Sequence, residues 1–545
     1  MTTTAPTAAP LSDQETAPRR PVDATLTSVQ PVVPGFHPDP SVCRVGDDYY
    51  LACSSFEYSP GVPLWHSTDL LTWDLVGNVL ERADQFTAAT AGASQGVYAP
   101  TLRHHDGRFW LVTTDVSGGG GQLLVSTEDP RGPWSSATRI PGLVGIDPDL
   151  AWSADGTCYV TYCSTTADAP GITQARVDLT SGEVLDGPRR IWQGSGLAHP
   201  EAPHLYEHDG WWYLVIAEGG TERGHTVAVA RSTSPEGPFE PAPHNPMLTH
   251  RSTAHPVQNT GHADLVELAD GSWAVVYLGV RPAGTTPLFH VNGRETFLAG
   301  IDWADGWPVV DEHRFSQAPV DRSFVEEFDG PRLHPRWVVP SASVDEVVRE
   351  QGQGRLVLAP VQSPSGDASI LAARTAGLRW RAETEVDAAA KSDTAPESAV
   401  PSGAVPSGAV SSGAVSSGAV SLGTTTSGVA LRVRLDDAHW CEVLLEAGVA
   451  RAVVRIGPLE SQVGTEVAVG ARRVTLVVEA AEPTHAGPDD LRLLVSQDGT
   501  DTELARVDGR YLSTEVAGGF TGRVVGVRAV GGPAVVHAFR YVDRG

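Results

Sequence analysis

The chain has 545 residues, 41% of them hydrophobic and 19% charged, so it is long enough to form two large globular domains. Its 39 basic residues against 66 acidic residues give a formal net charge of −27. So acidic a chain repels phosphate backbones and anionic lipid headgroups, and we therefore expect no nucleic-acid partner and no membrane partner. Neutral sugars remain open as ligands.

Two residue types narrow the chemistry further. Lysine occurs once, at Lys391, so a Walker-type phosphate loop and Schiff-base catalysis are both set aside. The five cysteines are scattered without a CxxC pair, which argues against a zinc ribbon or a disulfide framework and fits a reducing compartment. Arg19 and Arg20 precede no apolar run, and no apolar stretch is long enough to span a bilayer. We therefore expect a soluble, cytoplasmic protein.

The first part of the chain contains an internal repeat. Residues 1–28, rich in Thr, Ala and Pro, are predicted to be a disordered tail, and the repeat follows within residues 29–320. Its five copies are GDDYYLACSS (46–55), DGRFWLVTTD (106–115), DGTCYVTYCS (155–164), DGWWYLVIAE (209–218) and DGSWAVVYLG (270–279). Four of them begin with the Asp-Gly pair that favours hairpin turns, and β-branched and aromatic residues follow. Short strands repeating every 49 to 61 residues or so predict a five-bladed β-propeller.

A polar side chain stands at a shared position in front of each repeat: Asp39, Tyr98, Asp147, Glu201 and His262. If every blade is built alike, these positions lie on the first, innermost strand and converge at one mouth of the central channel. An isolated Asp-Pro or Glu-x-Pro pair usually caps a turn, but recurrence in register favours a site. Glycoside hydrolysis needs one carboxylic acid to protonate the leaving oxygen and one carboxylate to activate water. A third carboxylate nearby would raise the pKa of the acid.

Two further residues have open interpretations. His262 fits either a core histidine or a channel residue that binds substrate or holds a water or a hydrated cation. No two-histidine spacing such as HExxH supports a catalytic metal. Phe56 lies in a loop-like segment after the first repeat, where it could stack on a pyranose ring.

Residues 321–545 read as a second domain. Alternating apolar runs with Gly/Pro turns and no helical periodicity predict a β-sandwich. Inside it, residues 386–427 repeat PSGAV and SSGAV almost without charge, which predicts a flexible insertion in a loop of that domain. The fold class expected for the whole chain is all-β, a five-bladed propeller followed by a sandwich.

These motifs resemble glycoside hydrolase family 43, in its β-xylosidase and α-L-arabinofuranosidase members. The segments that carry the resemblance are HPDPS, VYAPT, IDPDL, HPEAPHLY, TGHADL and GRETF, in that order along the chain. The resemblance covers about residues 28–320 and continues into a domain similar to the family's concanavalin-like, jelly-roll sandwich. It implies a five-bladed propeller and an inverting mechanism.

The resemblance also implies a role for each site residue. Asp39 would be the general base that activates water, and Glu201 would be the general acid. Asp147 would tune the pKa of the acid and orient it. His262 and Arg294 would line the glycone pocket, with Arg294 bonded to sugar hydroxyls and to the Asp147 carboxylate.

The function expected from these observations is an inverting exo-glycosidase that releases terminal D-xylose from short xylo-oligosaccharides. An α-L-arabinofuranosidase is the close alternative, and a non-catalytic carbohydrate-binding protein is the alternative of another class. Tyr98 stands where many β-xylosidases of the family have tryptophan, so the pocket wall differs there. No cofactor is expected to be required, a structural calcium ion and a homo-oligomer are left open, and the partner is a small oligosaccharide.

Overall fold

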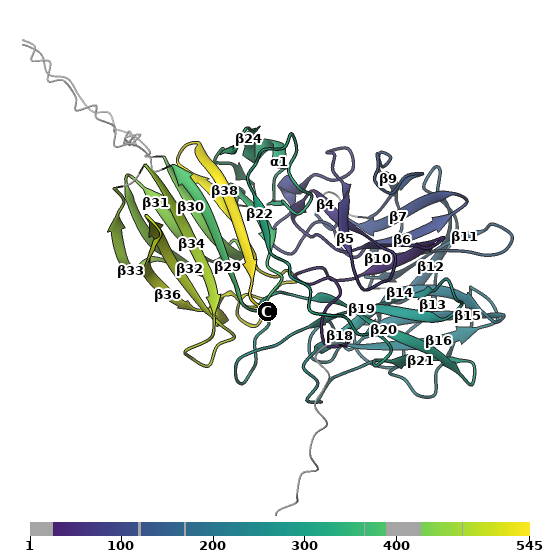
Figure 1. Cartoon of the computed structure of the whole chain (residues 1–545). Coiled ribbons are helices and arrows are strands. Elements are labelled where there is room, and N and C mark those ends of the chain that lie inside the picture. The colour runs from purple at the N-terminus through teal and green to yellow at the C-terminus, as the bar shows by residue number, and fades with distance from the viewer. Residues whose placement is uncertain (1–25, 118–120, 168–169, 365, 388–426, 471) are drawn as a thin grey trace, which may run out of the picture.

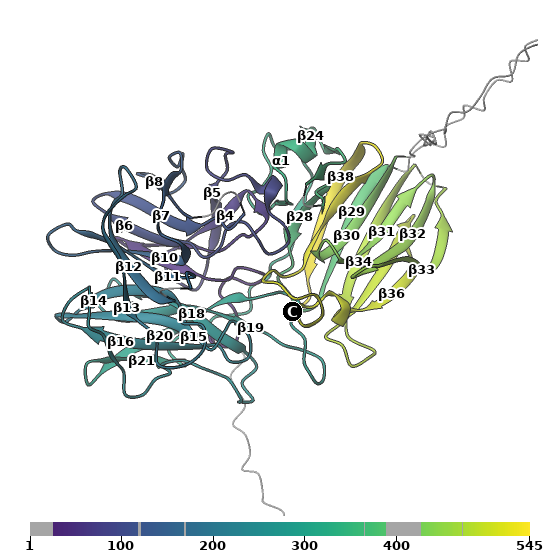
Figure 2. The same cartoon turned by 180° about the vertical axis from the view of Figure 1, so that it is seen from behind.

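Two β-sheet domains lie side by side in the computed structural model (Figures 1 and 2). The structure describes residues 26–117, 121–167, 170–364, 366–387, 427–470 and 472–545. Strands dominate both domains, which confirms the all-β prediction. None of the helices in this part of the chain has the length and apolar character needed to cross a bilayer.

In the described residues, the N-terminal domain contains five four-stranded antiparallel sheets that follow one another along the chain. Their first strands are β1 (Ser41–Val45), β6 (Thr101–His105), β10 (Gly145–Trp152), β14 (Glu201–His208) and β18 (Gln258–Glu267). The second strands are β2 (Asp48–Ala52), β7 (Arg108–Thr114), β11 (Cys158–Ser164), β15 (Trp211–Glu218) and β19 (Trp273–Val280). The third strands are β4 (Gly61–Ser67), β8 (Gln122–Thr127), β12 (Gly171–Asp178), β16 (Thr226–Ser232) and β20 (Glu295–Ala304). The fourth strands are β5 (Asp74–Leu80), β9 (Thr138–Ile140), β13 (Glu183–Trp192), β17 (Glu240–Pro241) and β21 (Trp307–Asp311).

Each sequence repeat forms the second strand of one sheet together with the turn that leads into it. At Asp106-Gly107 the two φ angles are 51° and 73°, and at Asp209-Gly210 they are 49° and 76°. A type I′ hairpin turn requires positive φ at both central residues, which Asp-Gly supplies at low steric cost. The Asp-Gly pair therefore forms the turn itself in these two repeats, whereas at Asp155-Gly156 and Asp270-Gly271 only the glycine has positive φ.

One buried arginine links the first strands of all five sheets. Arg103 in β6 donates to Asp264 Oδ2 in β18 and to Asp149 Oδ1 in β10, both at 2.8 Å. The same guanidinium lies 3.0 Å from His204 Nδ1 in β14 and 3.2 Å from Ser41 Oγ in β1. The charge of Arg103 compensates two buried carboxylates, which also accept hydrogen bonds from the backbone N–H groups of Val42 and Leu205. This cluster, the Arg103 hub, gathers the five first strands around one centre.

The N-terminal segment attaches to the last of the five sheets. Leu26, Thr27 and Ser28 are buried. The Thr27 hydroxyl donates to the Leu298 carbonyl at 2.7 Å, and Val33 forms a bridge with Thr296. Contacts between residues more than 250 positions apart thus join the start of the domain to β20.

The C-terminal domain is a β-sandwich, as predicted. One sheet contains β24 (Val348–Gly352), β25 (Arg355–Leu358), β38 (Ala534–Asp543), β29 (Trp380–Asp387), β34 (Arg473–Ala481), β35 (Asp490–Gln497) and β36 (Thr500–Asp508), with β22 (Phe324–Glu326) on β38. The other contains β28 (Ile370–Arg374), β37 (Val524–Val530), β30 (Gly428–Asp436), β31 (His439–Glu446), β32 (Val449–Ile456) and β33 (Leu459–Ala468). Every second residue of β29 is buried, because alternate side chains face the core between the sheets.

Two sequence predictions fall largely on residues that the structure does not describe. The predicted insertion lies between β29 and β30, and its residues 388–426 are outside the described residues. The same holds for residues 1–25 of the predicted tail.

The two domains share a hydrogen-bonded interface. The short strand β3 (Tyr58–Ser59) pairs with β23 (Val339–Pro340), which leads into the sandwich. From the sandwich, Arg434 donates to Tyr58 Oη at 2.6 Å and to Glu57 Oε1 at 3.3 Å, and all three side chains are buried. A buried, fully paired contact of this kind fixes the sandwich against the first sheet.

Candidate active site

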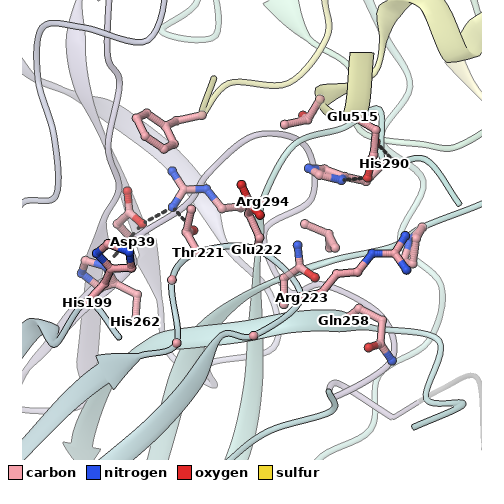
Figure 3. Close-up of a pocket in the computed structure, with 18 of the residues that line it drawn as sticks. Asp39, His199, Thr221, Glu222, Arg223, Gln258, His262, His290, Arg294 and Glu515 are labelled. Atoms are coloured by element: carbon pink, nitrogen blue, oxygen red, sulfur yellow. Dashed lines mark hydrogen bonds and ion pairs between the residues drawn. The ribbon is translucent and has the colours of Figure 1, made fainter. Parts of the chain in front are cut away.

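A pocket of about 1580 Å³ opens where the sandwich meets the five sheets (Figure 3). All seven side chains that the sequence predicted for the site line it: Asp39, Phe56, Tyr98, Asp147, Glu201, His262 and Arg294. The sandwich contributes residues 514–518 and Phe520 to the wall. The pocket is therefore built by both domains.

Irregular backbone positions the polar side chains at this mouth. Asp147 in β10 and His262 in β18 have φ of 55° and 44° and lie where the strand register shifts. Glu201 opens β14, and Ala202 beside it has φ of 53° at a similar shift. β-Bulges bend a strand and redirect its side chains. Three sheets thus use the same device to aim a polar residue into the pocket.

The other two repeat positions lie just outside their strands. Asp39 precedes β1 and Tyr98 precedes β6, so the prediction that all five positions lie on first strands is wrong for these two. Asp39 nevertheless has φ of 56°, close to the values at Asp147 and His262. All five side chains still reach the same pocket.

Asp39 is a buried carboxylate held by three partners. Its Oδ2 accepts a hydrogen bond from Ser54 Oγ at 2.5 Å, and its Oδ1 accepts one from Arg294 Nη1 at 3.0 Å. His262 Nδ1 lies 3.4 Å from Oδ1. Burial alone would raise the pKa of Asp39, but Arg294, His262 and Ser54 together hold it below its usual value. The side chain is therefore ionised at neutral pH.

Glu201 and Asp147 have raised pKa values, in contrast to Asp39. Burial raises the pKa of Glu201 to about 7, with Arg294 opposing and Asp39 adding to the rise. Burial and the charges of Glu201 and Asp39 raise the pKa of Asp147 well above its usual value. Such a pair titrates jointly, so near neutral pH it retains a proton that Asp39 lacks. Asp147 Oδ2 also accepts the backbone N–H of Ala202 at 3.1 Å, which fixes the segment carrying Glu201.

Two buried histidines lie beside the carboxylates, and the sequence identified one of them. Burial lowers the pKa of His262 to about 3 and that of His225 to about 4, so both rings are neutral at pH 7. His225 Nε2 lies 3.8 Å from Glu201 Oε1, while Nδ1 faces the Asn259 carbonyl at 3.0 Å. A Cβ at Gly261 would lie 2.1 Å from the His225 ring, so this glycine makes room for the histidine. His225 precedes β16, outside the repeat positions that drew attention in the sequence.

Arg294 contacts a different carboxylate from the one expected. Its Nη1 donates to Asp39 at 3.0 Å and to Thr221 Oγ1 at 3.1 Å, rather than to Asp147 (Figure 3). The reason is geometric, since Asp147 is turned by its bulge toward the Ala202 amide. Arg294 thereby compensates the negative charge of the ionised Asp39 carboxylate.

Aromatic rings form one wall of the pocket. Phe520 from the sandwich stacks on Phe56 with ring centroids 6.0 Å apart and lies edge-on to Tyr98 at 5.9 Å. Its backbone N–H donates to Ser94 Oγ at 2.8 Å, which anchors the loop on the first domain. Phe56 is almost completely buried behind Phe520, whereas Phe520 and Tyr98 are half-buried. Sequence analysis did not identify Phe520, because it lies in the other domain, far from the repeats.

A second polar contact joins the domains across the pocket. Glu515 in α2 (Thr514–Ala517) accepts from His290 Nδ1 at 2.7 Å and from the His290 backbone N–H at 3.0 Å (Figure 3). Burial would raise the pKa of Glu515, but the hydrogen bond and charge of His290 lower it. Arg223 and Gln258 line the same side. The pocket thus has a carboxylate end and a more open polar end.

The two buried aspartates of the Arg103 hub are not free to bind calcium. Calcium prefers a cage of six to eight oxygens, but Asp149 and Asp264 are already paired with the Arg103 guanidinium. A hydrated cation or a water at His262, and a structural calcium ion elsewhere, stay predictions.

Comparison with known proteins gives this geometry its context. Residues 28–308 match the family described as glycosyl hydrolases family 43, and residues 426–542 match the β-xylosidase C-terminal concanavalin A-like domain. A xylosidase/arabinosidase of Butyrivibrio fibrisolvens is 43% identical over 295 residues, 51% of this chain and 56% of that protein. The non-reducing end α-L-arabinofuranosidase BoGH43B of Bacteroides ovatus is 32% identical over 533 residues, 93% of this chain and 92% of that one. The crystal structure of a xylan β-1,4-xylosidase from Bacillus halodurans superposes with a TM-score of 0.79 at 26% identity, covering 94% of this chain and 99% of that one.

Fold, site and matches together define a glycoside hydrolase. More narrowly, the chain belongs to glycosyl hydrolase family 43 and carries the family's concanavalin-like C-terminal domain, which confirms the resemblance found in the sequence.

Proposed function

We propose that the protein is an inverting exo-glycosidase that releases terminal D-xylose from xylo-oligosaccharides. The observation that carries this proposal is that two carboxyl groups in one pocket have pKa values shifted in opposite directions. Arg294 and its neighbours keep Asp39 ionised, while burial keeps a proton on Glu201 up to about pH 7. In the same proposal, the five four-stranded sheets are the blades of a five-bladed propeller closed by the Arg103 hub.

The proposed reaction uses each carboxyl group once. Asp39 removes a proton from a water molecule as the water oxygen bonds to the anomeric carbon. The glycosidic C–O bond breaks, and Glu201 gives its proton to the departing oxygen. Asp147 positions Glu201 through the Ala202 amide and repels its ionised form. The sugar product leaves with its anomeric configuration inverted.

The walls of the pocket support action at a chain end. Residues 514–520 of the sandwich stand against the five sheets at the pocket and bring Phe520 close to Tyr98. A sugar unit would contact the aromatic wall, where the Arg294 guanidinium lies 5.5 Å from the centre of the Phe520 ring, and His262 as a further polar group. Sugar pockets combine apolar faces with a few polar groups in this way.

Release of terminal α-L-arabinofuranose is the second candidate, favoured by the Bacteroides ovatus relative that aligns over 93% of this chain. Side-by-side hydrolysis of 4-nitrophenyl β-D-xylopyranoside and 4-nitrophenyl α-L-arabinofuranoside separates the two. We expect the xyloside to dominate. Dominant arabinofuranoside cleavage would shift the assignment to the second candidate. Binding heat with xylobiose but no turnover of any glycoside would favour a carbohydrate-binding protein instead.

The stereochemistry and the base have their own tests. Proton NMR of xylobiose hydrolysis should show α-D-xylose as the first anomer formed, and β-D-xylose first would contradict inversion.

Asp39→Ala should abolish turnover of every glycoside, because water activation is required whatever the leaving group. Ser54→Ala is the matched control, since it removes one hydrogen bond to Asp39 and leaves Arg294 in place. Substantial turnover by Asp39→Ala would refute its role.

A further inference from the structure

Three metal-ligating side chains meet outside the carboxylate site. His250 and His255 lie in the segment between β17 and β18, and Glu312 directly follows β21. One ligand atom from each residue lies within 4.8 Å of the other two. Neither histidine belongs to the repeat positions, and the proposed reaction uses none of the three groups.

The hydrogen bonds of His250 require a positive centre at this place. Its Nδ1 lies 2.9 Å from the Val257 carbonyl, and its Nε2 lies 2.6 Å from Glu312 Oε1. Both neighbours are acceptors, so the ring donates from Nδ1 and needs either a second proton or a cation between Nε2 and the carboxylate. The side chain of His250 is 5% exposed, which makes an unmatched acceptor pair costly.

His255 brings a second imidazole to the same spot. Its ring centroid lies 3.8 Å from that of His250, and its Nδ1 lies 3.2 Å from the same Val257 carbonyl. His250 Nδ1 faces the Val257 carbonyl, and His255 Nδ1 lies 3.2 Å from that carbonyl and also 3.2 Å from the Val257 amide nitrogen, whose N–H it can accept, so Val257 orients both rings.

Glu312 supplies the anionic ligand. Its side chain is 31% exposed, which leaves a path for an ion and for a water ligand. Two imidazoles and one carboxylate, with a fourth position open, form a donor set typical of zinc.

We propose that His250, His255 and Glu312 form a binding site for a divalent first-row transition ion of the zinc class. Tetrahedral coordination at about 2.0–2.1 Å places neighbouring ligand atoms about 3.4 Å apart, so the atoms seen here need to move by roughly 1 Å. His255 and its neighbours Ser252, Pro256 and Gln258 line the pocket. The ion would therefore tie this pocket wall to the end of β21.

Zinc titration of the metal-free full-length protein tests the proposal. Isothermal titration should show a zinc site that His255→Ala and Glu312→Gln each weaken at least tenfold. His244→Ala is the matched control, because it removes an exposed histidine elsewhere on the same domain and should leave the affinity unchanged. Zinc should also raise the thermal midpoint of the wild type and of His244→Ala more than that of the two ligand variants. Circular dichroism without zinc establishes that every variant is folded.

Two outcomes would overturn the proposal. One is a wild-type protein that binds no zinc. The other is zinc binding that His255→Ala and Glu312→Gln leave intact, which would move the ion to another group such as the pocket histidines His225 and His262.

Discussion

Replacing Arg294 by methionine should move both limbs of the pH profile of kcat/KM toward higher pH. The guanidinium lies 3.0 Å from Asp39 and opposes the rise in the pKa of Glu201 as well. Without it, burial acts unopposed on both carboxyl groups. An opposite charge this close lowers the pKa of a carboxyl group by about 1–3 units, which corresponds to about 1.4–4 kcal/mol. The acid limb, set by Asp39, should therefore rise by about 1–3 pH units.

The assay is hydrolysis of xylobiose across the range from about pH 3 to pH 10, since its poor leaving group exposes the limb set by Glu201. The rate falls at low pH because Asp39 becomes protonated, and it falls at high pH because Glu201 loses its proton. Removing Arg294 raises both pKa values, so both limbs move toward higher pH. Arg294→Lys keeps the charge and should shift the profile less. An acid limb that stays in place or moves down in Arg294→Met would refute the assignment of Asp39 as the base tuned by Arg294.

Three other changes test separate parts of the structure. Glu201→Ala should slow xylobiose cleavage by about 10²–10⁴-fold and slow an aryl xyloside with an acidic phenol far less, and equal losses would argue against Glu201 as the acid. Phe520→Ala removes a half-buried ring at the pocket wall. The loss of about 1.5–3 kcal/mol of apolar contact with the sugar should lower kcat/KM by roughly 10–100-fold. An unchanged kcat/KM would mean that the sugar does not bind against Phe520. Arg103→Met leaves Asp149 and Asp264 buried without their partner, and chemical denaturation should show a loss of about 3–5 kcal/mol; a loss below about 1 kcal/mol would mean that the hub does not hold the sheets together.

The parts of the fold that were predictable are those that local sequence determines. The apolar segments that recur along the sequence each form the second strand of one sheet. Since the repeats share a register, the residues in front of them reach a common place, and Asp39, Asp147 and Glu201 were found in this way. Alternating apolar runs with Gly/Pro turns and no helical periodicity likewise predicted the sandwich.

The unpredicted features depend on where distant segments meet. The bulges at Asp147 and His262 arise where the register between the first and second strands of a sheet shifts. Such a shift depends on both strands, so the sequence of one strand does not reveal it. The turn of Asp147 toward Ala202 in turn decides that Arg294 bonds to Asp39. Phe520 reaches the pocket only because the sandwich docks through Arg434 on Glu57 and Tyr58.

The construction of the pocket from both ends of the chain has a consequence for biosynthesis. Asp39 leaves the ribosome early, but the bridge from Val33 to Thr296 that joins the first sheet to the last must wait for about 300 residues. Phe520 and Glu515 follow only near the end. The last of the three carboxylates is at residue 201, so at a synthesis rate of about 5–20 residues per second roughly 15–65 s pass before residue 520 is made. A nascent chain that stops between residues 201 and 514 therefore carries all three carboxylates in an unfinished site.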